Sequence, residues 1–121
     1  MKTVVCFFLT FLLFVNCNSQ NTEINSITTL ELIDLLKKDI QLLDVRTPEE
    51  VKNGAIEKAL FVNYFDKDFT EKAVNKLDKN KPVYLYCRSG NRSGKAAILL
   101  KNKGFKVVNV IGGYSQWIKE N

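Results

Sequence analysis

The chain has 121 residues, 45% of them hydrophobic, and carries a formal net charge of +5 with no histidine. Such a length suffices for one domain and is too short for two. The lack of histidine excludes Cys–His and Ser–His catalysis and most zinc sites. Because the lysines are dispersed and form no basic stripe interleaved with aromatic residues, we expect no binding to nucleic acid.

The first 16 residues have the pattern of a signal peptide. Lys2 supplies the positive start, and residues 4–15 form an apolar stretch that is too short to span a bilayer as a helix. Cys17 and the polar residues after it resemble a bacterial lipoprotein signal, in which the cysteine becomes the lipid-bearing first residue. The alternative is ordinary cleavage near Asn18 or Ser19. We therefore expect export to the bacterial periplasm or cell envelope, with a lipid anchor in the membrane.

The predicted mature chain consists of a tether and one domain. Residues 17–26 contain the lipidation site and a polar segment without apolar periodicity, which is typical of a flexible linker. Residues 27–121 contain the alternating apolar patterns of a folded domain.

Helix and strand patterns alternate along this domain. In chain order we expect a helix at 28–38, a strand at 40–45, a short helix at 47–52, a strand at 59–63, a helix at 69–77, a strand at 83–86, a helix at 93–103, a strand at 107–111 and a short helix after 113. Thr28, Asp68 and Ser93 stand at expected N-caps. The alternation predicts an α/β domain with a parallel sheet covered by helices on both faces.

Cys87 directly follows the strand predicted at 83–86 and is soon followed by a helix. Reactive groups in parallel sheets lie at the carboxyl ends of strands. A thiol in this place faces loop N–H groups and the positive end of a helix dipole, which stabilise an anion. Such surroundings lower a cysteine pKa from about 8.5 toward neutrality or below. Once Cys6 is removed and Cys17 carries lipid, Cys87 is a lone thiol in an exported protein, which marks it as reactive.

Two further motifs flank the Cys87 loop. Leu-Asp-Val-Arg at 43–46 is followed by Pro-Glu-Glu at 48–50, and Gly-Gly-Tyr-Ser-Gln-Trp stands at 112–117. With the loop, these motifs resemble the single-domain rhodaneses, which are thiosulfate-type sulfurtransferases, over nearly the whole mature chain. The resemblance implies a three-layer fold with a mostly parallel five-stranded sheet, and a loop cysteine that holds a sulfane sulfur as a persulfide.

The residues themselves favour the same chemistry. The Cys87 thiolate can attack the outer sulfur of thiosulfate, and sulfite then leaves. We predict that the loop stabilises the resulting persulfide without a metal or cofactor, and its residues are Arg88, Ser89, Gly90, Asn91, Arg92 and Ser93. The two arginines should favour a small dianionic donor. The acceptor is cyanide or a thiol, including a thiol on a protein. Asp44 and Arg46 are expected to support the site as an ion pair or loop anchor.

Other functions remain open at this point. A cysteine-dependent phosphatase or arsenate reductase has five residues between its cysteine and arginine, whereas four separate Cys87 from Arg92. A rhodanese-fold module that only binds anions or a partner has no need of a thiolate. A free cysteine at the end of a strand can also be a small packing residue. The sulfurtransferase interpretation therefore requires a thiol that solvent can reach and that is deprotonated near neutral pH.

Overall fold

The computed structural model describes residues 22–121. The expected signal peptide at 1–16 and the expected lipidation site at Cys17 lie outside these residues. Within residues 22–121, no helix combines the length and the hydrophobicity that a membrane span requires.

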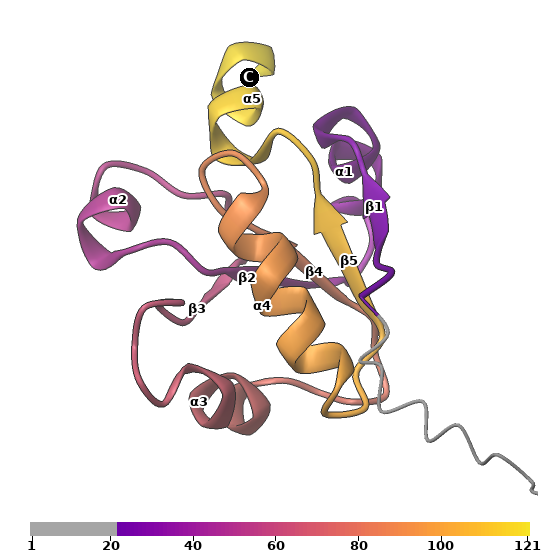
Figure 1. Ribbon diagram of the computed structural model, residues 1–121. Coiled ribbons are helices and arrows are strands. Elements are labelled where there is room, and N and C mark those ends of the chain that lie inside the picture. Colours follow the sequence, from indigo (N-terminus) through magenta and orange to yellow (C-terminus); the bar gives the residue numbers. More distant parts are fainter. Residues whose placement is uncertain (1–21) are drawn as a thin grey trace, which may run out of the picture.

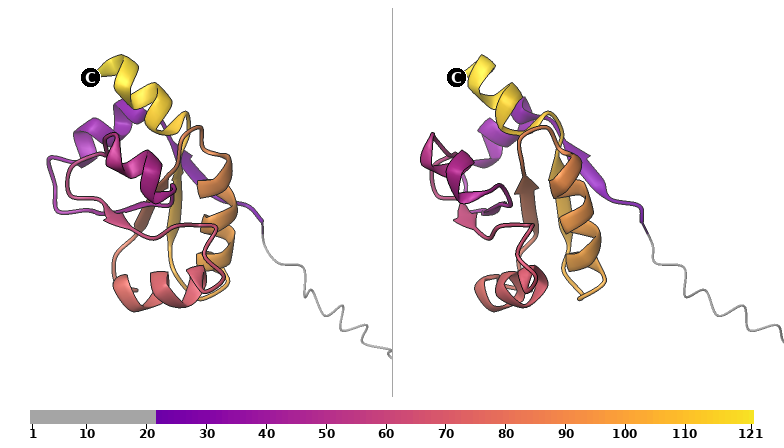
Figure 2. Two further views of the ribbon diagram at one scale, coloured as in Figure 1. Left: turned by 90° about the vertical axis from the view of Figure 1, so that its left-hand side faces the viewer. Right: turned by 60° about the vertical axis from the view of Figure 1, so that its left-hand side comes forward.

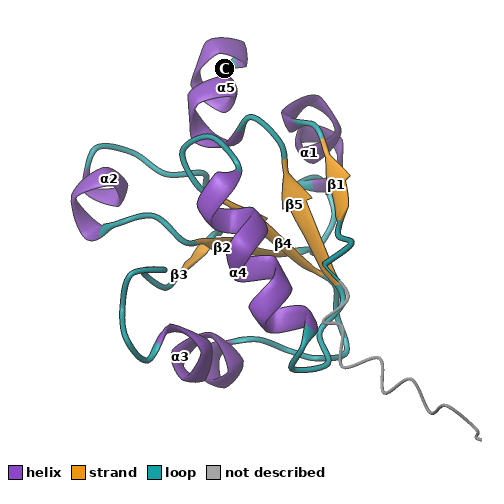
Figure 3. Ribbon diagram, in the orientation of Figure 1, coloured by secondary structure: helices purple, strands orange, loops and turns teal. Residues whose placement is uncertain are grey.

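A single parallel sheet forms the centre of the described part of the chain (Figure 1, Figure 3). Its strands are β1 (Asn25–Ile27), β2 (Gln41–Asp44), β3 (Leu60–Phe61), β4 (Val83–Tyr86) and β5 (Val107–Val110). The helices are α1 (Thr29–Leu35), α2 (Pro48–Lys52), α3 (Phe69–Lys76), α4 (Asn91–Lys101) and α5 (Gly113–Glu120). The strand order is β1-β5-β4-β2-β3, and every neighbouring pair is parallel. The expected α/β class and five-stranded sheet are confirmed, and the sheet is wholly parallel where a mostly parallel one was expected.

Alternation of side chains along the strands divides the core into two layers. In β4, Val83 and Leu85 pack with α3 and α4, whereas Tyr86 packs on the other face with residues of α1 and α5. Figure 2 shows α1 and α4 on opposite sides of the sheet. Because side chains on a strand alternate with a period of two, Cys87 continues the row of Val83 and Leu85 and faces the α4 side.

Strand β1 corrects the expected end of the tether. Asn25 and Ser26, assigned to the tether, pair with Val108 and Asn109 of β5 and so belong to the domain. The strand continues to Ile27, whose carbonyl accepts a hydrogen bond from the N–H of Ile111 (2.8 Å). An edge strand of three residues with one apolar side chain has no detectable periodicity, so the pattern could not indicate it.

Two of the predicted helix starts are confirmed by side-chain caps. The Thr28 hydroxyl accepts a hydrogen bond from the N–H of Glu31. Thr47 and Glu50 form a reciprocal capping box at the start of α2, with proline in its first turn. The helix at 28–38 is shorter than expected, since α1 ends at Leu35.

The other two predicted caps have different outcomes. Asp68 is the N-cap residue of α3, as expected, but its side chain makes no cap hydrogen bond and forms an ion pair with Lys72 (3.3 Å). Ser93 lies inside α4, which begins two residues earlier with Gly90 as its N-cap. Gly90 has a φ of 105°, a left-handed conformation that glycine adopts without strain. This turn lets the helix start early and places Ser93 within its first turn.

Candidate active site

Cys87 lies at the carboxyl end of β4, where the chain turns into α4. The turn between β5 and α5 holds the start of this loop: the N–H of Tyr114 donates to the Cys87 carbonyl (2.8 Å), and the N–H of Ser115 donates to the Arg88 carbonyl (3.0 Å). Gly113 permits this approach, because a Cβ at that position would collide with both carbonyl oxygens. The glycine pair at 112–113 is therefore part of the architecture of the loop.

Hydrogen bonds converge on the Cys87 sulfur. The N–H of Gly90 donates to Sγ at 3.1 Å, and the Ser93 hydroxyl lies 3.4 Å from the same atom. Burial acts to raise the pKa of Cys87, but hydrogen bonds from the Ser93 side chain and from the backbone N–H groups of Ser93, Gly90 and Ser89 outweigh it and lower the pKa. The expected anion cradle at the start of α4 is thus present in the structure.

The sulfur is less accessible than the sequence interpretation required. Cys87 is only 1% exposed and packs in the same core cluster as Leu85 and Ala96. Its burial resembles that of a packing cysteine, but its hydrogen bonds do not, because a purely apolar site would offer the sulfur no donors. Little of the Cys87 side chain is therefore open to a reagent.

Ser93 connects the sulfur to strand β5. Its hydroxyl donates to Oδ1 of Asn109 at 2.6 Å, and Nδ2 of Asn109 donates to the Gly90 carbonyl at 3.0 Å. A serine hydroxyl has one hydrogen. When it bonds to Asn109, the Ser93 oxygen can accept from the Cys87 thiol, and when it turns to Sγ it can stabilise the thiolate or persulfide. Asn109 therefore has two roles. Its Nδ2 group holds the loop at Gly90, and its Oδ1 atom is the alternative acceptor, besides Cys87 Sγ, for the hydrogen of the Ser93 hydroxyl.

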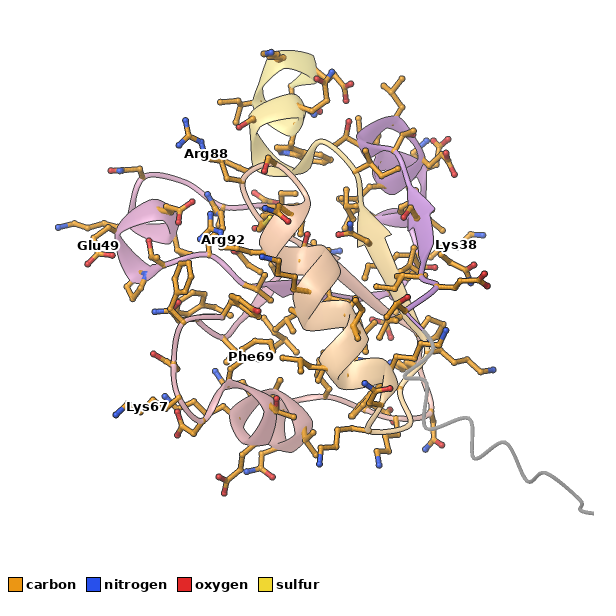
Figure 4. The ribbon with its side chains drawn as sticks, viewed as in Figure 1. Lys38, Glu49, Lys67, Phe69, Arg88 and Arg92 are labelled. Atoms are coloured by element: carbon orange, nitrogen blue, oxygen red, sulfur yellow. The ribbon has the colours of Figure 1, made fainter. Side chains whose placement is uncertain are left out.

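The two loop arginines differ in their surroundings. Arg92 forms a bidentate ion pair with Glu50 of α2, with its two terminal nitrogens 2.7 and 2.8 Å from the carboxylate oxygens. Arg88 is exposed and makes no ion pair within residues 22–121, and Figure 4 shows it pointing away from α4. Both arginines were expected to raise the positive potential near the sulfur, and the structure shows that one of them, Arg92, is paired with Glu50.

Glu50 is held as an ionised carboxylate. Its hydrogen bonds from Arg92, against the effect of burial, lower its pKa to about 2, and the bonds from Thr47 act in the same direction. Arg92 also lies over the ring of Phe65, with the guanidinium carbon 5.6 Å from the ring centroid. The pair links α2 to the first turn of α4, beside the cysteine loop.

Asp44 and Arg46 form an ion pair, as expected, but on the opposite face of the sheet from Cys87. The Arg46 guanidinium donates to Asp44 at 2.7 Å and to the Gly54 carbonyl at 2.7 Å. Tyr86 donates to the same Asp44 carboxylate at 2.6 Å, and its oxygen accepts from the N–H of Ile56. Arg46 is 2% exposed, so it supports the strand end before the loop and is not placed to meet a substrate.

The remaining predicted loop residues play backbone roles. Ser89 and Asn91 are exposed, Ser89 provides a backbone N–H near the sulfur, and Asn91 is the first residue of α4. Sequence analysis missed Glu50 and Asn109 as site residues. Glu50 is the third residue of the Pro-Glu-Glu motif, but the motif alone gave no sign of its pairing with Arg92. Asn109 is a polar residue in an apolar strand, and that contrast could have indicated a buried contact.

Comparisons with known proteins agree with this geometry. A family model described as the rhodanese-like domain matches residues 28–120. The YtwF protein of Bacillus subtilis is 40% identical over 97 residues, which cover 78% of this chain and 91% of that protein. The chloroplastic thiosulfate sulfurtransferase 16 of Arabidopsis thaliana is 34% identical over 105 residues, with coverage of 78% and 88%. The crystal structure of a rhodanese-like domain protein from Staphylococcus aureus has a TM-score of 0.71 at 38% identity and covers 78% of this chain and 91% of that one.

Proposed function

The chain belongs to the rhodanese family, and from this premise we propose that it moves a sulfane sulfur from thiosulfate or a similar donor, through a Cys87 persulfide, to cyanide or a thiol. The observation that carries the proposal is the Cys87 sulfur at the end of β4, which accepts a hydrogen bond from the N–H of Gly90 and has a lowered pKa. The name of the Arabidopsis relative supports sulfur transfer as the general class of reaction.

In the first half-reaction the Cys87 thiolate attacks the outer sulfur of thiosulfate. A new S–S bond forms to Sγ, the S–S bond of thiosulfate breaks, and its electron pair leaves with sulfite. The product is an anionic Cys87 persulfide, so the negative charge stays in the loop. The N–H of Gly90 and the Ser93 hydroxyl, which already face Sγ, are placed to stabilise it.

In the second half-reaction an acceptor attacks the outer sulfur of the persulfide. The S–S bond breaks, the Cys87 thiolate is regenerated, and cyanide becomes thiocyanate or a thiol becomes a persulfide. Two half-reactions on one residue predict ping-pong kinetics. Because Cys87 is 1% exposed, a thin anion such as thiosulfate should load the enzyme faster than a bulky donor of equal charge.

Intact mass spectrometry tests the proposal. After incubation with thiosulfate we expect the wild-type mass to increase by one sulfur atom, and cyanide to remove that increase. The Cys87→Ser variant should show no gain, because it lacks the nucleophile.

Two outcomes contradict sulfur transfer and identify the alternatives. Hydrolysis of an aryl phosphate without any sulfur gain favours a phosphatase, although the four residues between Cys87 and Arg92 form a loop one residue shorter than phosphatases use. Anion binding without turnover of either compound favours a binding module.

We also infer from the sequence that the protein is exported and carries lipid on Cys17. The support is the apolar stretch at 4–15 followed by this cysteine and a polar segment. In cells fed an alkyne fatty acid, the full-length chain should be labelled and membrane-associated, while Cys17→Ala should be unlabelled. Equal labelling of the two chains contradicts lipidation at Cys17, and a soluble, shortened, unlabelled wild type indicates ordinary signal-peptide cleavage.

A further inference from the structure

We propose that Glu50 sets the donor preference of the site, by neutralising Arg92 and so favouring monoanionic sulfane donors, such as thiosulfonates and organic persulfides, relative to dianionic thiosulfate. The inference rests on the proposed sulfurtransferase function. It concerns which class of donor the Cys87 loop selects.

The ion pair between Glu50 and Arg92 has a fixed geometry. Both carboxylate oxygens of Glu50 bind separate nitrogens of Arg92, and the two side chains are only 29% and 19% exposed. Thr47 adds hydrogen bonds to Glu50 from its N–H (3.3 Å) and its hydroxyl (3.1 Å), so the carboxylate is fixed from its own helix as well. A fixed, partly buried, bidentate pair resists displacement by an incoming anion far better than an exposed pair.

Arg92 lies beside the sulfur in the fold: it directly precedes Ser93 in the first turn of α4, and the Ser93 hydroxyl is 3.4 Å from Sγ. In agreement with this placement, the pKa of Arg92 is raised by its hydrogen bonds to Glu50 and, to a smaller extent, by the negative charge of Cys87. An unpaired Arg92 charge would therefore attract an anion approaching Cys87. Glu50 places a compensating negative charge on the same guanidinium, and the remaining loop arginine, Arg88, points away from the loop (Figure 4).

The consequence differs between donor classes, because electrostatic attraction is proportional to the charge of the donor. Neutralising Arg92 removes twice as much attraction from a dianion as from a monoanion. The chemistry is the same for both. Cys87 attacks the outer sulfur of benzenethiosulfonate, the new S–S bond forms, and benzenesulfinate leaves with the electron pair, just as sulfite leaves thiosulfate.

The experiment compares kcat/KM for thiosulfate and benzenethiosulfonate with cyanide as the common acceptor. In Glu50→Gln, which can still accept hydrogen bonds from Thr47, we expect the thiosulfate-to-thiosulfonate ratio to rise about three- to tenfold. The matched control is Glu49→Gln. Glu49 is exposed on the same helix and points away from Arg92 (Figure 4), so the same loss of charge should leave the ratio within about twofold of wild type.

A second variant tests whether Glu50 acts through Arg92. The double variant Glu50→Gln/Arg92→Gln should return the ratio to within about twofold of wild type, because both charges of the pair are then removed. Wild type gives an independent measurement. Its kcat/KM for thiosulfate should vary less than about twofold between low and physiological ionic strength, as expected for a site without net attraction for a dianion.

The inference is overturned if the ratio stays unchanged in Glu50→Gln, if Glu49→Gln raises it equally, if the double variant Glu50→Gln/Arg92→Gln keeps the raised ratio of Glu50→Gln, or if thiosulfate turnover by wild type falls steeply with salt. In each of these cases wild type still transfers sulfur, so the proposed function stands. If neither donor adds sulfur to Cys87 in wild type, the proposed function itself fails.

Discussion

At the Cys87 sulfur, burial and hydrogen bonding act on the pKa in opposite directions. Burial disfavours the thiolate, while the Ser93 hydroxyl and the N–H groups of the loop favour it, and the hydrogen bonds prevail. The thiolate therefore depends on these few hydrogen-bond donors. The Ser93 hydroxyl contributes most among the groups that lower the pKa of Cys87, so its removal should decrease the fraction of Cys87 that is present as thiolate.

Ser93→Ala should raise the pKa of Cys87, since the thiolate loses the hydrogen bond from the Ser93 hydroxyl. The titration is measured by thiolate absorbance, and sulfur loading at neutral pH should slow about tenfold, the equivalent of one hydrogen bond to a charged group. Ser89→Ala is the matched control, because Ser89 lies in the same loop but offers the sulfur only its backbone N–H. A pKa that moves equally in both variants contradicts the assigned role of the Ser93 hydroxyl.

The Glu50–Arg92 pair gives the stability of the protein a defined acid dependence. Folding lowers the pKa of Glu50 from 4.5 to about 2. A depressed carboxyl pKa contributes stability that is fully present above pH 4.5 and is lost as the pH falls toward 2. We expect wild type to exceed Glu50→Gln in unfolding free energy by about 1 kcal/mol at pH 6, after allowance for solvent screening, and by almost nothing near pH 2.

Urea unfolding at a series of pH values measures this difference, and Glu49→Gln corrects for the loss of one acidic charge from α2. A stability difference that stays constant from pH 6 to pH 2 contradicts the role of ionised Glu50. The prediction is independent of donor preference, because it needs no substrate.

At the scale of elements, the loop is shaped from two sides, by the start of α4 and by the turn before α5. Sequence patterns predicted β4 at its observed bounds, because the run at 83–86 is apolar and ends at a turn. They misplaced the start of α4 by two residues, because Ser93 has the chemistry of an N-cap while the left-handed backbone at Gly90 actually starts the helix. They missed β1 because pairing with β5, and not its own composition, defines it.

Gly113→Ala should disrupt the Cys87 loop, although the substituted residue lies outside that loop. The added Cβ would collide with the carbonyl oxygens of Cys87 and Arg88, at a backbone φ of 54°. We expect a loss of at least about 2 kcal/mol in unfolding free energy and at least tenfold slower sulfur loading.

Gly104→Ala separates the effect of the collision with the loop from the effect of a positive φ. Gly104 also has a positive φ, 93°, but an added Cβ there meets only the end of the Lys79 side chain at 3.8 Å. Its variant should lose about 1 kcal/mol and load sulfur normally. Equal loss of loading in both variants would show that overall stability, and not the contact at Gly113, governs the loop.

At the scale of the whole molecule, the two faces of the sheet differ in role at the carboxyl end of β4: one holds the reactive cysteine and the other a stabilising ion pair. Cys87 and Ser93 face the α4 side, and Tyr86 with its ion-paired partners, Asp44 and Arg46, lies on the other. The sequence motif at 43–46 indicated this ion pair, but only the alternation of strand side chains shows that the pair faces away from the sulfur. Substitutions on the Tyr86 side should therefore change stability more than chemistry.

Tyr86→Phe tests this division. The hydroxyl donates to Asp44 at 2.6 Å and accepts from the N–H of Ile56 at 3.1 Å, and Tyr86 is fully buried. Its removal leaves the buried N–H of Ile56 unpaired and takes one hydrogen bond from the Asp44 carboxylate, which keeps those from Arg46, so we expect a loss of about 2–3 kcal/mol in unfolding free energy. Tyr84→Phe, a half-buried position of β4 packed in the same layer, should cost well under 1 kcal/mol.

Sulfur loading is the second measurement on these variants, made at least 15 °C below the midpoint of thermal unfolding. Both Tyr86→Phe and Tyr84→Phe should then gain one sulfur on Cys87 at a rate within about twofold of wild type, because neither hydroxyl faces the reacting atom. A large loss of loading in folded Tyr86→Phe contradicts the division, and it would mean that the carboxyl end of β4 transmits strain from the ion-paired face to the loop.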